Sequence, residues 1–91
     1  MIVIITENAL PKIRGELTRW LLEAKPGVFV GDVSASVREK LWEKIVNEIP
    51  RLGALMFFSA QTEQGFAMRM NGYPKRQVVD IEGIQLITTK S

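Results

Sequence analysis

The sequence has no cysteine and no histidine among its 91 residues. Without cysteine the chain can form neither disulfides nor thiolate metal sites. Without histidine it has no imidazole metal ligand and no histidine general acid or base. The metal ions that the chain can bind well are hard cations such as Mg²⁺, Mn²⁺ or Ca²⁺, which take carboxylate and carbonyl oxygens as ligands.

Long apolar runs and a strong charge of one sign are also missing. The longest apolar run near the N-terminus is Ile2 to Ile5. That is far shorter than the roughly 7–15 residues of a signal-peptide core or the about 20 of a spanning helix. We therefore expect a cytoplasmic protein that does not associate with membranes. The net charge of +2 permits nucleic acid as a partner without requiring it.

The composition is that of an ordinary globular domain, with 46% hydrophobic and 24% charged residues. We expect one domain over residues 1–91 with a single core. A chain of this size buries only about 60–65% of its unfolded surface, so a second subunit would add needed stability. A homodimer is the natural expectation.

The first half of the chain predicts strand, helix and strand. The β-branched apolar run 2–6 is typical of a central strand buried on both faces. Pro11 fits the first turn of a helix, and apolar residues at spacings of three and four extend that helix to Ala24. These residues are Ile13, Leu17, Trp20, Leu21 and Ala24. Pro26-Gly27 ends the helix, and 28–30 is a short second strand.

The second half predicts one more helix and several short strands. Asp32, Ser34 and Ser36 are all competent N-caps, and Ser36 and Glu39 have capping-box spacing. The following helix should run to about Ile49, before Pro50. Strands are expected at 54–60, 65–70, 78–81 and 84–87. This order predicts a two-layer α+β sandwich with both helices on one face of an antiparallel sheet. The segment 73–91 would leave an unpaired strand edge that another protomer could pair with.

Three acidic or amide side chains are candidate metal ligands. Glu7 ends the first strand, and Asn8 could add an amide oxygen for Mg²⁺. Two copies of Glu7 would meet at one axis in a symmetric dimer. The alternative is a solvated loop carboxylate. Asp32 is a possible further ligand, but "GDVSAS" supplies so much capping chemistry that a helix N-cap is the stronger interpretation.

Four cations are candidates for phosphate binding. Lys12 and Arg14 occupy a helix N-terminus, where the helix dipole disfavours cations by about 0.3–1 kcal/mol. A bound phosphate would offset this cost, although a pair of merely solvated cations remains possible. Lys75 and Arg76 lie beside Tyr73 in a loop and could contact backbone phosphates in the same way.

Several stretches together resemble a known protein family. They are "VIITEN", "RGELTRWLLEAKPGVFVGDVSASVREKLWEKI", Gly65-Phe66, the basic pair Lys75-Arg76 and the tail "VVDIEGIQLI". The sequence is similar to the small CRISPR-associated adaptation proteins of the Cas two type, in their type I-E branch. The resemblance extends through almost the entire chain.

The resemblance implies a ferredoxin-like α+β fold in a two-fold symmetric dimer, with the C-terminal strand exchanged onto the partner's sheet. It implies a place at the centre of the spacer-acquisition integrase, where the dimer bridges the larger catalytic subunits and supports protospacer duplex DNA. The tail contacts the dimer partner and the larger subunit. For this role the candidate positions are Val79, Ile81, Ile84 and Leu86.

The resemblance also assigns roles to the candidate site residues. The family's backbone-binding positions fall on Lys12, Arg14, Lys75 and Arg76, which implies sequence-independent DNA contact. Many relatives are metal-dependent endonucleases with an Asp at the end of the first strand, where this chain has Glu7. Two hypotheses follow: a non-catalytic DNA scaffold, or a phosphodiesterase in which paired Glu7 residues hold Mg²⁺ that activates water.

Overall fold

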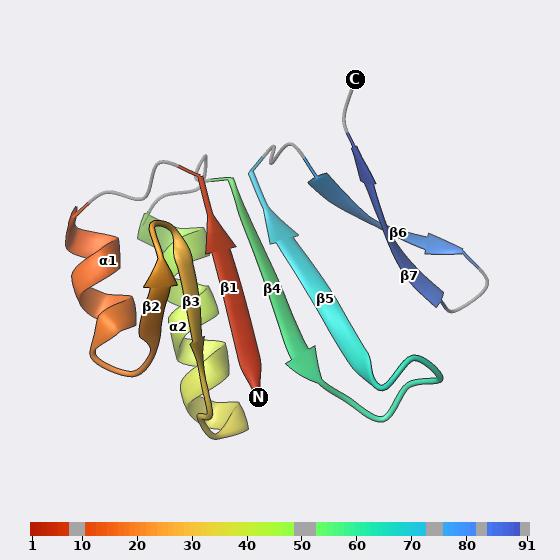
Figure 1. Ribbon diagram of the computed structural model, residues 1–91, viewed down its shortest axis with the longest axis horizontal. Coiled ribbons are helices and arrows are strands. Elements are labelled where there is room, and N and C mark those ends of the chain that lie inside the picture. Colours follow the sequence, from red (N-terminus) through yellow and green to blue (C-terminus); the bar gives the residue numbers. More distant parts are fainter. Residues whose placement is uncertain (8–10, 49–52, 73–75, 82–83, 90–91) are drawn as a thin grey trace.

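The computed structural model describes residues 1–7, 11–48, 53–72, 76–81 and 84–89. Two helices and seven strands fall within these ranges (Figure 1). In chain order they are β1 (Ile2–Thr6), α1 (Pro11–Thr18), β2 (Leu22–Lys25), β3 (Val28–Gly31), α2 (Ala35–Glu48), β4 (Ala54–Ser59), β5 (Phe66–Asn71), β6 (Arg76–Ile81) and β7 (Ile84–Thr89). Within the described ranges, neither helix combines the length and apolarity needed to cross a membrane.

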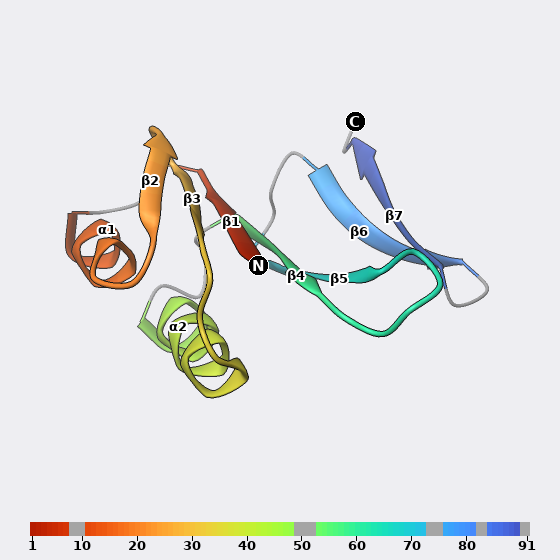
Figure 2. The ribbon, with the colours of Figure 1, turned by 60° about the horizontal axis from the view of Figure 1, so that its bottom comes forward.

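The main sheet is antiparallel and has the strand order β2-β3-β1-β4-β5. β1 is the central strand, as its uniformly apolar sequence predicted. Both helices lie on the same side of this sheet (Figure 2). The predicted two-layer α+β sandwich is therefore confirmed, and the arrangement is consistent with a ferredoxin-like fold.

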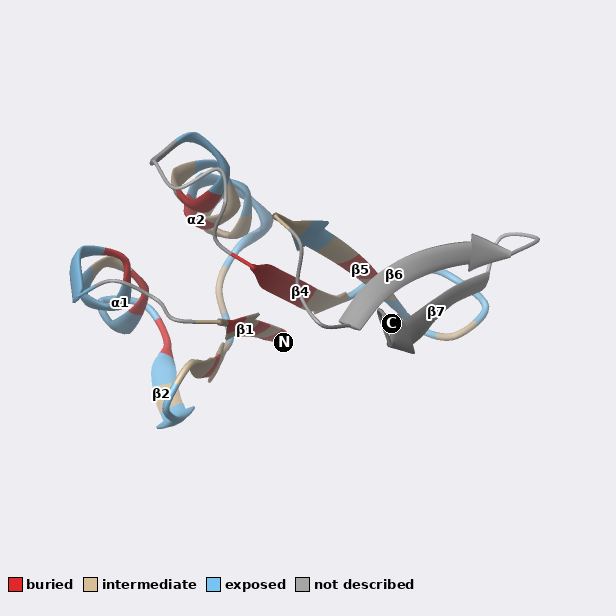
Figure 3. Cartoon of the chain, turned by 90° about the horizontal axis from the view of Figure 1, so that it is seen from above, coloured by how far each residue is buried: buried red, intermediate tan, exposed pale blue. Residues whose placement is uncertain are grey.

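The core lies between this sheet and the helices. Ile4 of β1 stands opposite Phe29 of β3 and Met56 of β4 in the strand register, and all three are fully buried. Leu17 of α1 and Ile45 of α2 cover them from the helix layer. The red positions on α1, α2 and β1 in Figure 3 belong to this core.

The other sheet face is apolar but only partly covered. One row of paired positions crosses all five strands: Leu22, Val30, Val3, Phe57 and Met68. We call these five residues the open row. Leu22 is 69% exposed, whereas Met68 is buried. The expectation that β1 is buried on both faces is therefore wrong, because no helix in the described residues covers the open row (Figure 3).

The predicted first helix is shorter than expected. α1 ends at Thr18, whose hydroxyl donates to the carbonyl oxygens of Arg14 (2.8 Å) and Gly15 (3.3 Å). Such back-bonding, together with a glycine inside the helix, disfavours continuation. A turn at residues 19–21 follows, and the next residues form β2, which pairs with β3. Trp20 is consequently 52% exposed rather than part of the core.

The structure uses Ser34 among the three candidate caps of the second helix, Asp32, Ser34 and Ser36, so the N-cap interpretation of Asp32 is wrong. Ser34 is the N-cap, because its hydroxyl oxygen accepts the Val37 N–H at 3.2 Å and its carbonyl accepts the Arg38 N–H at 2.9 Å. The capping box proposed for Ser36 and Glu39 is therefore wrong. A serine cap contributes typically about 1 kcal/mol.

The C-terminal strands form a separate two-stranded antiparallel sheet. β6 pairs with β7, and this hairpin lies past β5 on the side of the main sheet away from the helices (Figures 2 and 3). Both strands are longer than the sequence predicted. Exchange of the C-terminal strand onto a second protomer stays a prediction.

Candidate nucleic-acid interface

Glu7 and the first turn of α1, which carries Lys12 and Arg14, lie at one end of the main sheet, which we call the Glu7 end. There the backbone N–H of Thr6 donates to the carbonyl oxygen of Gly27 at 2.8 Å, and the Thr6 hydroxyl donates to the same oxygen at 3.2 Å. The backbone N–H of Glu7 donates to the Gly53 carbonyl oxygen at 2.8 Å. These bonds fix the β2–β3 turn and the start of β4 to the end of β1.

Gly27 is required at this turn for two reasons. Its φ is +82°, a backbone conformation that L side chains rarely adopt. A Cβ added there would lie 2.7 Å from the backbone oxygen of Thr6, which cannot move aside as a flexible side chain could. Glycine thus allows the turn to close directly against the Glu7 end.

Arg14 is fixed to this turn through Glu23. The Arg14 Nη2 atom donates to Glu23 Oε1 at 3.1 Å, and the Gly27 N–H donates to Glu23 Oε2 at 3.0 Å. The Gly27 hydrogen bond, followed by that of Arg14, holds the pKa of Glu23 below its ordinary value of 4.5. The side chain of Arg14 remains 47% exposed, so its guanidinium is both oriented and accessible.

The Glu23 contact predicts a pH-dependent stability. A carboxyl whose pKa is lowered by folding stabilises the protein above its unfolded pKa, and this contribution is lost as pH falls through the folded pKa. We expect Glu23→Gln to be less stable than the wild type at pH 7, with the difference shrinking below about pH 4.5. Urea unfolding at a series of pH values measures it. A difference that stays constant down to pH 3 would contradict this linkage.

Lys12 and Arg14 emerge on opposite sides of α1. Ile13 between them is buried against the sheet, and neighbouring helical residues are rotated by about 100° from each other. The first turn of α1 contains no acidic residue. Both exposed cations therefore lie near the positive end of the helix dipole. This arrangement favours the binding of an anion at the start of α1.

The basic loop starts at the same end of the sheet. Thr6 pairs with Ala54, which pairs with Asn71, so β5 ends beside the end of β1. β6 then begins at Arg76 (Figure 1). Lys75 and the Arg76 side chain lie outside the described residues. The chain that carries both cations nevertheless leaves the sheet at the Glu7 end.

The described residues of one chain do not fit a divalent cation. They contain no group of three or more acidic, histidine or cysteine side chains close enough to hold a metal. Asp32 pairs with the Met1 amine at 3.1 Å, at the opposite end of β1 from Glu7. The two carboxylates cannot share an ion within one chain, since a five-residue strand, roughly 17 Å long, separates them. Asn8 lies outside the described residues.

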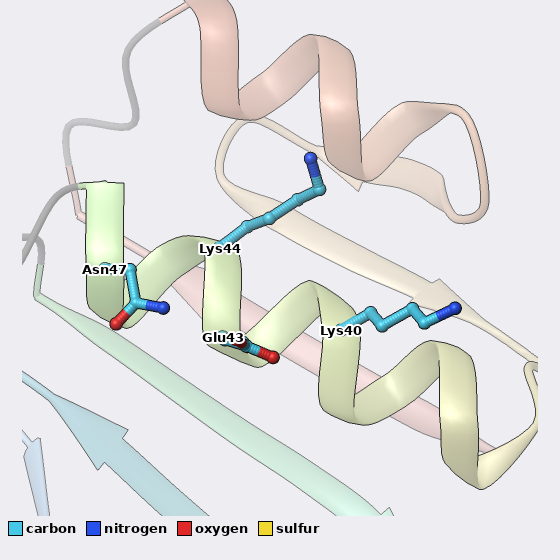
Figure 4. A pocket seen from close by; sticks show the side chains of 4 residues that line it. All are labelled: Lys40, Glu43, Lys44 and Asn47. Atoms are coloured by element: carbon cyan, nitrogen blue, oxygen red, sulfur yellow. The ribbon is translucent and has the colours of Figure 1, made fainter.

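Two hollows lie on the helix layer, and their described lining residues include no candidate site residue. A hollow of about 290 Å³ is lined by Lys40, Glu43, Lys44 and Asn47 of α2 (Figure 4). Lys44 extends toward α1, where its Nζ lies 3.4 Å from Glu16 Oε2. A second hollow, of about 220 Å³, is lined by Glu16, Arg19, Trp20, Val37, Lys40, Leu41 and Lys44.

Comparison with known families decides the identity of the chain. The family model described as CRISPR-associated protein (Cas_Cas2CT1978) matches residues 1–86. The chain belongs to this CRISPR-associated family. The resemblance inferred from the sequence is thereby confirmed at the level of the family, while the type I-E branch stays a prediction. This match includes every proposed site and tail position, from Glu7 to Leu86.

The hairpin of this CRISPR-associated protein brings the four tail positions together in pairs. Val79 stands opposite Leu86, and Ile81 stands opposite Ile84 in the β6–β7 register. Because directly opposed residues share a face of a sheet, all four positions belong to one face of the hairpin. A role for this face in dimer or partner contact stays a prediction.

The role of Glu23 in this CRISPR-associated chain could not be recognised from the predicted elements. The expected helix extends to Ala24 and would include Glu23, so it predicts no contact between Arg14 and Glu23 across a turn. The signal that could have found it is the Pro26-Gly27 turn. A turn following so soon after Thr18 favours a hairpin, which would place Glu23 on its first strand.

Proposed function

We propose that this protein is a non-catalytic, homodimeric scaffold of CRISPR spacer acquisition. In this proposal it binds protospacer duplex DNA through backbone phosphates and bridges the larger catalytic integrase subunits. All transesterification chemistry then belongs to the larger subunit. The proposal also places the protein in the cytoplasm, where this DNA would be captured.

The observation that carries the proposal is the arrangement of cations at the Glu7 end. Arg14 is held by Glu23 yet remains half exposed, and Lys12 flanks the same helix start. The segment that leads to Lys75 and Arg76 follows β5, which ends at the same end of the sheet but on the other side of β1. A fixed guanidinium group with a neighbouring ammonium group at one end of the sheet suits a polyanion, and contacts to phosphates need no base sequence.

The open row supports the dimer. Four of its five positions, Leu22, Val30, Val3 and Phe57, are exposed or only partly covered, and Met68 is buried. Met70 and Phe66, on the same face of β5, are 43% and 38% exposed. A contiguous apolar surface of this kind is typical of protein interfaces, and a second copy of the chain would cover it symmetrically.

The test is a titration of the purified protein against labelled duplex DNA, with and without the larger integrase subunit, in Mg²⁺ and in EDTA. Binding and product length are followed together. We expect metal-independent binding of uncut DNA that weakens as salt rises and strengthens with the partner. Mg²⁺-dependent shortening of the DNA that is lost in Glu7→Ala would overturn the scaffold and support the metal-dependent endonuclease.

A further inference from the structure

Two arginines meet over one aromatic ring between α2 and β5. Arg38 belongs to the first turns of α2, Arg69 to β5, and Phe58 to β4. The Cζ atoms of Arg38 and Arg69 lie 4.1 Å and 4.9 Å from the centroid of the Phe58 ring. Both distances are within the roughly 6 Å reach of a cation–π interaction. The ring thus holds two cationic groups in one place.

Glu39 links the same two arginines. Arg38 Nε donates to Glu39 Oε2 at 2.9 Å, and Arg69 Nη1 donates to Glu39 Oε1 at 2.6 Å. Hydrogen bonds from Arg69 and then Arg38 lower the pKa of Glu39 below its ordinary value, so the carboxylate stays ionised at neutral pH. One negative charge therefore faces two positive ones, and the cluster keeps a net charge of +1.

Most donors of this cluster remain available. A guanidinium carries five N–H donors. Among the described residues, the hydrogen bonds of Arg38 and Arg69 use only the Nε atom of the first and the Nη1 atom of the second. The side chains are 22% and 31% exposed, so they reach solvent although both are fixed by Phe58 and Glu39.

We propose that Arg38 and Arg69 form a phosphate-binding site that contacts a backbone phosphodiester of nucleic acid. The inference rests on the proposed DNA-binding function and adds a contact to it. A phosphodiester has two unesterified oxygens, which can each accept from one guanidinium, and arginine pairs especially well with such groups. Because Phe58 and Glu39 already orient the donors, little side-chain freedom is lost on binding.

The site is separate from the cations of the Glu7 end. Arg38 and Arg69 lie on the helix side of the sheet at the α2–β5 flank, whereas Lys12 and Arg14 belong to α1, which is not beside β5 (Figure 1). The two groups therefore contact different phosphates. Since they share no partner, losses of affinity from changing both groups should add.

The affinity test compares two double variants of equal charge. Arg38→Gln with Arg69→Gln removes the cluster, and Arg19→Gln with Lys40→Gln removes two exposed cations elsewhere. We expect the cluster variant to bind duplex DNA roughly tenfold more weakly than the control variant at low salt. The slope of log affinity against log salt should also fall by about 1 for the phosphate that is lost. Equal affinities and slopes in the two variants would overturn the proposal.

A second test uses the wild type and does not depend on how well the variants fold. The side-chain Nε–H resonances of Arg38 and Arg69 are followed by NMR during titration with duplex DNA, inorganic phosphate or a glutamate-rich peptide. We expect saturable shifts with DNA, and weaker ones with inorganic phosphate. Shifts with the acidic peptide alone would assign the site to a protein partner instead, and no shift with DNA would overturn it.

These outcomes separate the further inference from the proposed function. If the wild type does not bind duplex DNA at all, the proposed scaffold function fails. If the wild type binds, and changes at Lys12 and Arg14 weaken it while the cluster variant matches its control, only the Arg38–Arg69 site fails.

Discussion

Reversing the charges of Lys12 and Arg14 together should weaken duplex DNA binding at least about a hundredfold at low salt. Each lost contact between a cation and a phosphate costs about 1.5–3 kcal/mol, and the introduced carboxylates add repulsion. Arg14→Glu also places a second carboxylate beside Glu23, so the β2–β3 turn would no longer orient a donor. Fluorescence anisotropy with a labelled duplex of arbitrary sequence measures the effect.

The control for this variant reverses the same number of charges away from the Glu7 end. Arg19→Glu with Lys40→Glu changes the net charge equally but leaves the first turn of α1 intact. This control should lose only the part of the affinity that depends on overall charge. Equal losses of affinity in the two variants would mean that DNA binding depends on the net charge of the protein and not on the geometry of the Glu7 end.

The layers of the fold could be predicted because the strongest sequence signals coincide with the core. The run 2–6 has no polar residue before Thr6, and it is the central strand. The apolar spacing of Leu41 and Ile45 matches the buried side of α2. Both signals arise from burial, which acts on many residues at once and therefore leaves a periodic pattern.

The region after Thr18 could not be predicted from periodicity. Leu21 and Ala24 continue a helical spacing, yet this segment pairs with β3 as β2, and the pairing is irregular between Glu23 and Lys25. A strand that is exposed along most of its length shows no alternation of apolar and polar residues. Pairing with β3 decided its structure, and helix propensity is too weak to oppose such tertiary contacts.

The residues of the candidate site stand out in the sequence, whereas the contacts between them do not. Lys12 and Arg14 stood out because they contradict the helix dipole, a rule that depends on local sequence. The Arg14–Glu23–Gly27 contacts depend on the β2–β3 turn. The Arg38–Arg69 cluster depends on the packing of α2 beside β5. Contacts between residues far apart in sequence leave no periodic signal in a single sequence.

Replacing Phe29 with alanine should destabilise the fold by about 3–5 kcal/mol. Phe29 is fully buried between the sheet and the helix layer, and it stands opposite Ile4 of the central strand. Its removal leaves a cavity that the surrounding strands cannot fill. Small domains have total stabilities of about 5–15 kcal/mol, so the loss would be a large share of the whole. Urea unfolding and thermal melting measure it.

Phe29→Leu is the control, because it retains an apolar side chain in the same place and should cost clearly less. A loss below about 1 kcal/mol for Phe29→Ala would contradict the packing described for this residue. At a temperature where Phe29→Leu is fully folded, its DNA binding should equal that of the wild type, since Phe29 has no exposed surface. The Lys12→Glu, Arg14→Glu variant should show the reverse, with DNA binding lost and a melting temperature that falls far less than that of Phe29→Ala, because the Arg14–Glu23 contact that it breaks is partly exposed to solvent. Together the two variants separate what holds the Glu7 end in place from what contacts the DNA there.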